Sequence, residues 1–304
     1  MTDADYPGVS ETPWLREIGR FGTAPTENLL IRGDARDALR SLIALPTFGT
    51  RYVGNVQLAY IDPPFNTGYR FTDYSDRLAP TAWLSMLRDC FTKVKILLAE
   101  TGSLWAHLDD HGQHRARTVL DEVFGVENFV ATVVWDRANT SRATTKTFAN
   151  RHDYIHVYRK SPAFSLQPVP SGDANTRRPS TVWTSGDVGS GREGSAESRR
   201  LFGEPFATPK PERLISRIIE LATRPEDIVL DCFAGSGTTA AVAQKLRRRW
   251  VTVEAEEATV RDFLQPRLVR VVAGTDDGGI TEYSHWTGGG GFARLNVEPP
   301  LQSP

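Results

Sequence analysis

The feature that most constrains the fold is an alternation of short apolar runs with amphipathic helical patterns along most of this 304-residue chain. Between the apolar runs, apolar residues recur three and four positions apart, as in a helix with one buried face. This alternation is typical of a mostly parallel sheet covered by helices. The predicted strands span residues 28–34, 56–62, 103–109, 129–135, 153–160, 227–233 and 250–256, and the predicted helices span 35–45, 81–100, 114–125 and 211–224.

Some segments do not follow this pattern. Residues 161–206 are rich in Gly, Ser, Pro and Arg, which predicts an insertion or a long functional loop outside the main core. The two ends of the chain look irregular. The predicted organisation is an N-terminal tail at 1–25, a first part of the main domain at 26–160, the inserted segment at 161–206, a second part at 207–273 and a C-terminal extension at 274–304.

Composition narrows the classes of protein. The chain has 36 basic and 37 acidic residues, so overall charge indicates no polyanionic partner. These totals do not exclude a local basic face. Two cysteines are too few for a disulfide framework, which favours a reducing compartment. The chain has no long apolar stretch and no signal-peptide pattern at its start, so we expect a soluble, cytoplasmic protein without membrane contact.

The stretch "DIVLDCFAGSGTTAAVAQKL" predicts a ligand site. A strand ends at Asp231, a turn with Gly235 and Gly237 follows, and a helix of small residues begins. Ligands of open α/β sheets bind beyond the carboxyl ends of strands, where glycines let the backbone approach them closely. Glu254 closes the next predicted strand, where a carboxylate can accept both hydroxyls of a ribose. The pattern indicates an adenosine-containing cofactor, with a nicotinamide dinucleotide or a plain glycine turn still open.

The stretch "AYIDPPFNTG" predicts chemistry beside that cofactor. Asp62 ends a strand, so its carboxylate should project into the same crevice, and Pro63 and Pro64 stiffen the loop that follows. The Asp62 carboxylate and the Pro63 carbonyl could hold an amine conjugated to an aromatic ring in the geometry for attack. Phe65 would stack on that ring. The stretch therefore favours an aromatic amine as substrate.

Taken together, these motifs resemble the amino-group DNA methyltransferases. "DPPF" resembles their catalytic tetrapeptide, and "DCFAGSGT" with "VTVEAEE" resembles their S-adenosylmethionine site. The catalytic motif precedes the cofactor motif, which is the permuted order of the β class. "IDPPFNTG" and "AGTDDGGITE" are most similar to modification subunits of type III restriction systems. The resemblance implies an α/β fold with a circularly permuted Rossmann-like sheet, in which 26–160 is the catalytic part and 207–273 the cofactor-binding part.

The resemblance also implies roles for individual residues. Asp62, Pro63, Pro64 and Phe65 would hold the target base, with Asn66 beside them. Asp34 would reach the cofactor's adenine, although "GD" before a helical pattern is equally typical of a helix N-cap. The other implied cofactor residues are Asp231, Phe233, Gly235 and Gly237 along the cofactor, Glu254 at its ribose, and Thr208, Pro209 and Lys210 near its methionine part.

The implied activity is transfer of a methyl group from S-adenosylmethionine to the N6 amine of adenine in duplex DNA, with the base flipped out of the helix and no metal. N4-cytosine methylation uses the same chemistry, but Ser usually replaces Asp at position 62 in those enzymes. A silent nucleic-acid-binding subunit is a second alternative, and a nicotinamide oxidoreductase leaves "DPPF" unexplained. Implied partners are double-stranded DNA, a restriction subunit and a second copy of the chain.

The inserted segment 161–206 lies where the resembled families place target recognition. Long segments outside the core are usually functional or disordered, so a flexible linker is the alternative. Arginines in this segment suit phosphates and the acceptor edge of guanine. The predicted DNA-binding residues are Arg177, Arg178, Trp183, Arg192, Arg199 and Arg200.

Other reactive side chains receive structural interpretations. His107, His111 and His114 lack an acidic or cysteine partner in the sequence pattern, so we expect solvated histidines and not a metal site. The basic run at 245–250 ends a predicted helix, where cations suit the helix dipole, although a phosphate patch is the alternative. Cys90 and Cys232 lie in an apolar helix and in the cofactor strand, which argues against an attacking thiolate.

Overall fold

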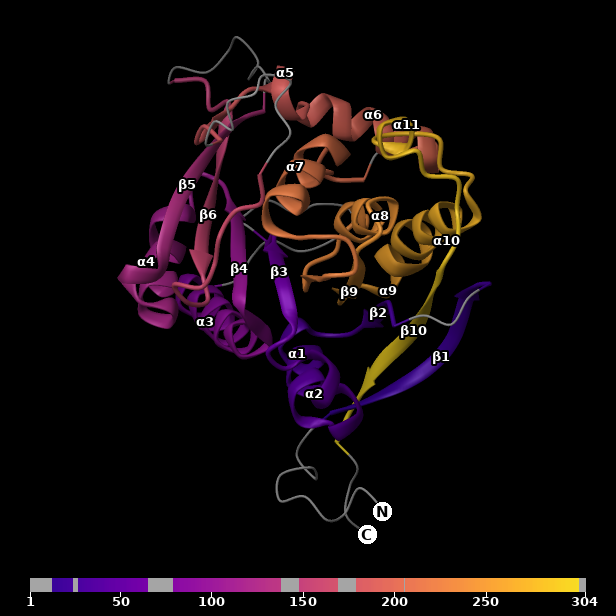
Figure 1. The fold of residues 1–304 in the computed structure, drawn as a ribbon, viewed down its shortest axis with the longest axis horizontal. Coiled ribbons are helices and arrows are strands. Elements are labelled where there is room, and N and C mark those ends of the chain that lie inside the picture. The colour runs from indigo at the N-terminus through magenta and orange to yellow at the C-terminus, as the bar shows by residue number, and fades with distance from the viewer. Residues whose placement is uncertain are drawn as a thin grey trace.

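One large sheet organises the molecule (Figure 1). The computed structural model describes residues 13–23, 27–64, 79–137, 148–168, 179–204 and 206–300. These residues form a ten-stranded sheet in the order β1-β10-β2-β9-β8-β3-β4-β6-β5-β7, with helices on both faces. The predicted α/β class is confirmed. The strands are β1 (Trp14–Gly22), β2 (Leu29–Arg32), β3 (Val56–Ile61), β4 (Leu98–Leu108), β5 (Phe129–Asp136), β6 (His152–Arg159), β7 (Val182–Trp183), β8 (Ile228–Asp231), β9 (Arg249–Glu254) and β10 (Gly291–Glu298).

The centre of the sheet is parallel and its edges are mixed. Strands β10, β2, β9, β8, β3 and β4 pair parallel to one another, whereas β6 pairs antiparallel to both β4 and β5. From β8 the chain proceeds to β9 on one side, and from β3 it proceeds to β4 on the other side. The boundary between β8 and β3 is therefore the point where strand order reverses, which is where ligands bind in open α/β sheets.

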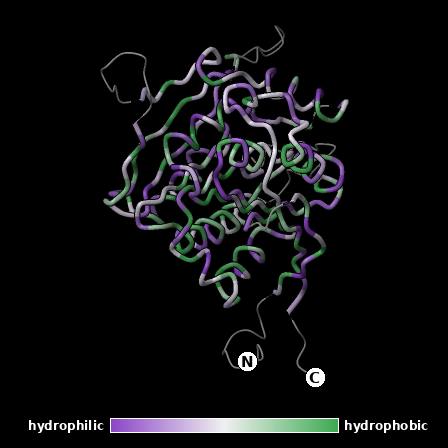
Figure 2. The backbone as a smooth tube through the Cα atoms, turned by 45° about the vertical axis from the view of Figure 1, so that its right-hand side comes forward, coloured by the Kyte–Doolittle hydropathy of each residue, from purple (hydrophilic) through white to green (hydrophobic). Residues whose placement is uncertain are grey.

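Helices cover the two faces because side chains of each strand alternate between them. Leu29 and Ile31 of β2 join the core on the side of α1, α3 and α4, whereas Leu30 joins the core on the side of α7, α8 and α10. Figure 2 shows polar and apolar stretches interspersed along the chain. The helices are α1 (Ala35–Ala44), α2 (Pro46–Tyr52), α3 (Pro80–Leu97), α4 (Gln113–Phe124), α5 (Ser185–Val188), α6 (Gly191–Phe202), α7 (Glu212–Ala222), α8 (Thr238–Lys245), α9 (Glu257–Thr259), α10 (Gln265–Ala273) and α11 (Thr281–Ser284).

The prediction that both chain ends are irregular was wrong for the described parts of these ends, 13–23 and 274–300. Strands β1 and β10 pair antiparallel and extend the sheet beyond β2. The sequence of β1 hides this strand because its register shifts between Glu17 and Gly19, and because an edge strand leaves many side chains exposed. A smaller correction concerns residues 98–100, predicted as the end of a helix, which are the start of β4.

The prediction that residues 161–206 lie outside the main core was also wrong for the described part of this segment. It contributes β7, α5 and α6, and its side chains Trp183 and Val188 join the core on the side of α7. In Figure 1 helix α6 lies over α7. Apolar residues are sparse here, but each of these two is placed where it can be buried. Residues 169–178 lie outside the described part.

Candidate functional site

A pocket of about 380 Å³ opens at the boundary between β8 and β3. It is lined by the carboxyl ends of β8, β9 and β3, by the turn before α8, and by the segment before α7. The sequence-predicted residues that it brings together are Asp34, Asp62, Pro63, Pro64, Thr208, Pro209, Lys210, Asp231, Phe233, Gly235 and Glu254. Phe65 and Asn66 lie outside the described residues.

Glu254 ends β9 and holds the glycine turn. Its Oε2 accepts a hydrogen bond from the Gly235 N–H at 2.9 Å, and its Oε1 accepts one from the Glu256 N–H at 3.0 Å. Each carboxylate oxygen has two lone pairs, so both oxygens retain capacity for a ligand's hydroxyl groups. Burial raises the pKa of Glu254 above its ordinary value.

Asp231 ends β8 at the bottom of the pocket. Its Oδ1 accepts a hydrogen bond from the Phe233 N–H at 3.0 Å, which fixes the start of the turn. Burial raises the pKa of Asp231 to about 7, so this carboxyl group is close to half-ionised at neutral pH. A positively charged ligand group beside it would favour the ionised form.

Two glycines shape the turn between β8 and α8. Gly235 and Gly237 have φ values of 51° and 80°, in the left-handed region that glycine adopts without a steric penalty. A Cβ on Gly237 would also approach Leu264 Cδ1 to 2.4 Å. Gly235 lines the pocket, but Gly237 is buried behind it and acts through the backbone conformation. The predicted cofactor contact of Gly237 stays a prediction.

Asp34 combines both interpretations that its sequence context left open. It is the N-cap of α1, where its Oδ1 accepts the Arg36 N–H at 2.8 Å, and it also lines the pocket. The Arg36 guanidinium bonds the same carboxylate at 3.0 and 3.1 Å. Capping therefore accounts for part of this aspartate's environment, and its position at the pocket leaves the predicted contact with adenine available.

Asp62 follows β3 and faces the pocket together with Lys210. The Lys210 ammonium donates to Asp62 Oδ2, and Asp62 Oδ1 is buried with no hydrogen-bond partner in the described part of the chain. The resemblance implied that Lys210 lies near the cofactor's methionine part. Its ion pair with Asp62 was not predicted.

The diproline segment is fixed by a tryptophan that sequence reasoning missed. Trp83 of α3 donates its indole N–H to the Pro64 carbonyl at 2.7 Å, and its ring is buried. This bond holds the diproline segment in place, and the Pro63 carbonyl and Asp62 Oδ1 are the predicted acceptors for a substrate amine. The spacing of Trp83 in an amphipathic helix was the only sequence signal for its position.

Comparisons with known proteins agree with this geometry. A family model described as DNA methylase, for N6 and N4 methyltransferases, matches residues 56–265, which is more than half of the chain. The chain belongs to this family.

The StyLTI Mod subunit of Salmonella typhimurium, a type III restriction-modification enzyme, is 24% identical over 82% of the chain. The probable type III HindVI Mod subunit of Haemophilus influenzae is 23% identical over 90% of the chain. The chain spans 57% and 54% of the lengths of these relatives. The resemblance to type III modification subunits is thus confirmed.

Solved structures confirm that the chain has a methyltransferase fold. The PvuII cytosine-N4-specific DNA methyltransferase superposes with a TM-score of 0.60, with 18% identity over 83% of this chain and 89% of that one. M1.HpyAVI, solved as a complex with SAM, superposes with a TM-score of 0.51 and 18% identity over 79% of this chain and 98% of that one. The fold is shared by the N4-specific PvuII enzyme and by M1.HpyAVI, so the fold alone does not identify the target base of this chain.

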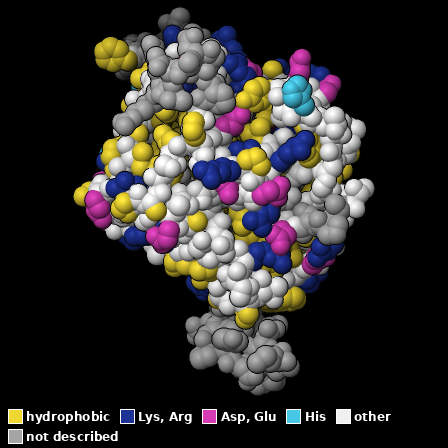
Figure 3. All heavy atoms as spheres, in the orientation of Figure 1, with side chains coloured by type: hydrophobic (Ala, Val, Ile, Leu, Met, Phe, Trp, Pro, Cys, Tyr) yellow, Lys and Arg dark blue, Asp and Glu magenta, His cyan; other side chains and the backbone are white. Residues whose placement is uncertain are grey.

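The predicted DNA-binding residues of the chain divide into three groups. Arg177 and Arg178 lie outside the described residues. Arg192, Arg199 and Arg200 are exposed on α6, where Arg200 pairs with Asp277 at 2.6 Å. Figure 3 shows basic and acidic side chains intermingled over one face of the molecule. The predicted role of these five arginines in binding DNA stays a prediction.

Trp183 was wrongly predicted as a surface reader of DNA. Its side chain is 1% exposed, and its ring lies 6.2 Å from that of Trp105. The Arg217 guanidinium covers it at 4.9 Å, and its indole N–H donates to the Ser180 carbonyl at 2.7 Å. Trp183 is a core residue because β7 pairs with β5 and turns its side chain inward.

His107 is fully buried, so the expectation of a solvated histidine was wrong for this residue. Its Nδ1 lies 2.8 Å from the Tyr60 hydroxyl and its Nε2 lies 3.2 Å from Asp153 Oδ2. Tyr60 lines the pocket. Neighbouring strands β3, β4 and β6 thus form a buried polar chain beside the site, which short-range sequence patterns could not reveal.

The remaining reactive groups have structural surroundings. In the basic run 245–250, Lys245 lies in the last turn of α8, as predicted, and is buried between Glu212 and Asp276. Cys90 and Cys232 are buried. The described residues contain no group of three or more His, Cys, Asp or Glu suited to a metal ion. Within the described ranges, no helix has the length and apolar character needed to cross a bilayer.

Proposed function

We propose that the chain transfers a methyl group from S-adenosylmethionine to the N6 amine of adenine in double-stranded DNA. One observation carries this proposal: the carboxyl ends of β8, β9 and β3 place the predicted cofactor carboxylates and the DPPF aspartate around a single pocket. Ligand pockets commonly measure about 300 to 1,000 Å³, and the volume of about 380 Å³ lies within this range.

The charges of the pocket fit this cofactor. Its acidic side chains outnumber its basic ones, which suits a ligand that carries a sulfonium and an ammonium group. Glu254 is positioned for ribose hydroxyls, and Asp231 lies beside it. The acidic residues are Asp34, Asp62, Asp231, Glu254 and Glu256, and the basic residues are Arg36 and Lys210.

Asp62 supplies the main catalytic contact. When bound, S-adenosylmethionine supplies an electrophilic methyl group. Asp62 Oδ1 and the Pro63 carbonyl accept N–H bonds from the target amine and orient its lone pair. As the amine nitrogen takes the methyl group, the bond between that methyl carbon and the sulfonium sulfur would break and leave a neutral thioether, and the Asp62 carboxylate would stabilise the positive charge on the nitrogen until a proton leaves to solvent. The carboxylate at position 62 favours adenine, because N4-cytosine enzymes of the resembled family usually carry Ser there.

The proposal also covers DNA recognition and protein partners. The domain division at 26–160, 161–206 and 207–273 stays as proposed, with α6 carrying exposed Arg192 and Arg199 toward the DNA. Target bases are reached by flipping them out of the duplex. Because the relatives are Mod subunits of restriction-modification enzymes, a restriction subunit is the proposed partner, and a second copy of the chain is another. Action on cellular DNA places the protein in the cytoplasm.

Expression in a methylation-free bacterial host tests this proposal. Sequencing of modified bases should show N6-methyladenine at one recurrent sequence, absent with Asp62→Ala and retained with Asp262→Ala, which removes an exposed aspartate outside the pocket. N4-methylcytosine would reassign the target base. A folded, cofactor-binding protein that leaves the DNA unmodified would instead be a silent binding subunit.

A further inference from the structure

The ion pair at the mouth of the pocket points to a role for Lys210 that the sequence did not indicate. We propose that Lys210 is a positioning residue for Asp62, holding Oδ2 of the carboxylate so that Oδ1 remains directed to the target amine. This inference rests on the proposed function and adds a residue to it. Lys210 acts through Asp62 and need not touch the base.

The two oxygens of Asp62 have different surroundings. Lys210 Nζ bonds Oδ2, and the two side chains are only 10% and 21% exposed. Oδ1 is buried, and no donor among the described residues reaches it. A buried acceptor without a partner is unfavourable, so this atom is suited to a donor that enters with the substrate. With Oδ2 occupied, the carboxylate cannot rotate freely to offer either oxygen.

The backbone around Lys210 is stiff. Pro209 and Pro211 flank it, and proline fixes φ near −65°. Thr208, just before them, has a φ of 51°, which is uncommon for a residue with a Cβ. Pro211 is the N-cap of α7, so the lysine stands directly on the start of a helix. The position of the ammonium group therefore depends on how that helix start is held.

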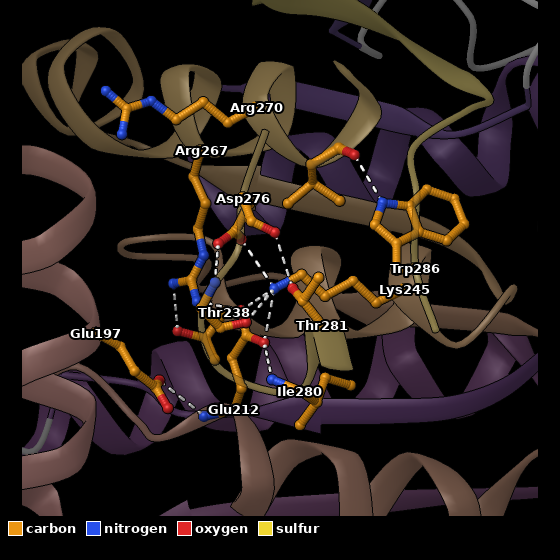
Figure 4. Close-up of polar contacts among 12 residues, drawn as sticks. Glu197, Glu212, Thr238, Lys245, Arg267, Arg270, Asp276, Ile280, Thr281 and Trp286 are labelled. Atoms are coloured by element: carbon orange, nitrogen blue, oxygen red, sulfur yellow. Dashed lines mark hydrogen bonds and ion pairs between the residues drawn. The ribbon is translucent and has the colours of Figure 1, made fainter. Parts of the chain in front are cut away.

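A buried polar network holds the start of α7 (Figure 4). Glu212, two residues after Lys210, accepts bonds from Lys245 Nζ at 2.9 Å and from Arg267 Nη2 at 2.8 Å. Its N–H donates to Glu197 Oε2 at 3.0 Å, and the Ile280 N–H donates to its Oε2 at 2.9 Å. Because Glu212 is buried and held on several sides, the segment that carries Lys210 has little freedom to shift.

Helix α6 fixes the same segment from the outside. Gly194 approaches it so closely that a Cβ there would lie 2.4 Å from the Pro209 carbonyl oxygen and 3.0 Å from the Lys210 carbonyl carbon. Backbone therefore packs against backbone, and Gly194 is required for this contact. A substitution at this glycine would displace Lys210 without changing any charge, which offers an independent way to test its placement.

The first test replaces the lysine. Lys210→Met, Lys210→Arg and Lys93→Met are compared, because Lys93 also pairs with an aspartate, Asp89 on α3, but does not line the pocket. Single-turnover methyl transfer is measured with saturating S-adenosylmethionine and genomic DNA from a methylation-free host, and cofactor affinity is measured by calorimetry. Small misplacements of reacting groups cost up to about a hundredfold in rate.

We expect Lys210→Met to slow transfer about tenfold to a hundredfold while cofactor affinity stays within about threefold. Lys210→Arg should recover most of the rate because it restores a cation at Asp62, and Lys93→Met should match the wild type. Weakened cofactor binding with a normal rate at saturation would overturn the proposal and assign Lys210 to the cofactor's methionine part. An unchanged rate and affinity would overturn it as well.

The second test moves Lys210 without changing it. Gly194→Ala should slow transfer by about tenfold, with cofactor affinity preserved. Gly186→Ala is the matched control, since a Cβ there meets only Thr184 Oγ1 at an ordinary 3.6 Å. Equal rates for the two variants would contradict the proposed positioning. If the wild type itself transfers no methyl group to DNA, the proposed function fails; if it does and all variants match it, only the role of Lys210 fails.

Discussion

The carboxylates on the two sides of the pocket are held in different ways. On the side of β8 and β9, Asp231 and Glu254 accept hydrogen bonds from main-chain N–H groups of the turns that follow their own strands or lie beside them. On the side of β3, Asp62 is held by the side chain of Lys210, 148 residues further along the chain. The proposed cofactor side is thus built from local backbone, and the proposed catalytic side from a long-range ion pair.

This difference predicts that cofactor binding and methyl transfer depend on different residues. Main-chain donors fixed by glycine turns and buried strands present the cofactor carboxylates in one arrangement. The geometry of Asp62 depends instead on its ion pair with Lys210, so a change at either residue would alter what the carboxylate offers to a target amine. We therefore expect substitutions on the cofactor side to change affinity and stability, and substitutions on the catalytic side to change the rate of transfer.

The largest expected effect is a loss of stability when the buried network of Arg267, Glu212 and Thr238 is disrupted. Arg267 bonds Thr238 Oγ1 at 2.8 Å and Glu212 Oε1 at 2.8 Å, and it is almost inaccessible to solvent. Arg267→Met should lower the free energy of unfolding by about 3 to 5 kcal/mol, because it leaves a buried carboxylate short of a partner. Urea denaturation measures this change. Arg261→Met, which breaks the exposed ion pair with Asp262, should leave the urea midpoint of unfolding unchanged. Equal losses of stability in the two variants would contradict the role of the buried network.

The next effect concerns the catalytic side alone. Asp62→Ala should slow methyl transfer by at least about a hundredfold, because the target amine loses its acceptor. Affinity for S-adenosylmethionine should stay within about tenfold, since Glu254 and the glycine turn are unchanged. Single-turnover kinetics and calorimetry on the same preparation separate the two quantities. Near-normal transfer would remove Asp62 from the reaction.

On the cofactor side, Glu254→Ala should weaken binding of S-adenosylmethionine by about 1.5 to 3 kcal/mol. The loss includes the ribose contact and the tether to the Gly235 N–H. Glu256→Ala removes an exposed carboxylate from the same pocket rim and should have a much smaller effect. If calorimetry gives the wild-type affinity for a folded Glu254→Ala protein, Glu254 does not bind the cofactor.

The smallest effect depends on pH. Burial raises the pKa of Asp231 to about 7 from an ordinary 3.8, so the folded protein retains a proton that the unfolded chain has released. This contribution to stability is present at low pH and is lost as pH rises toward and through 7. Between pH 6 and 8 it should decrease by about 1.4 kcal/mol. Asp231→Asn, which mimics the protonated form, should lack this component. Parallel pH profiles of unfolding for both proteins would contradict the assignment.

The sequence located the strand ends at Asp231 and Glu254 and the glycine turn between β8 and α8 because these features are local. A strand end, a glycine turn and the end of the next strand lie within one short stretch, and their residue types reflect backbone requirements such as the positive φ of Gly235. The central strands were also found within a few residues, since buried strands are continuously apolar. For Asp62, sequence reasoning found the residue and its strand end but not its partner.

The failures share a physical cause, which is that pairing between distant segments decided the outcome. Trp183 lies in a polar stretch, yet pairing of β7 with β5 buries it. His107 gains its partners Tyr60 and Asp153 only through neighbouring strands. Strands β1 and β10 were missed because each is stabilised by the other, at opposite ends of the chain. No local pattern records such contacts.

The most direct test of the account is to identify the atom that receives the methyl group. Purified protein is incubated with methyl-labelled S-adenosylmethionine and methylation-free genomic DNA, and the DNA is digested to nucleosides for mass spectrometry. The account predicts label on N6-methyldeoxyadenosine, reduced by at least about a hundredfold with Asp62→Ala. Label on carbon 5 of cytosine, transfer that persists without Asp62, or no labelled nucleoside from a cofactor-binding protein would contradict it.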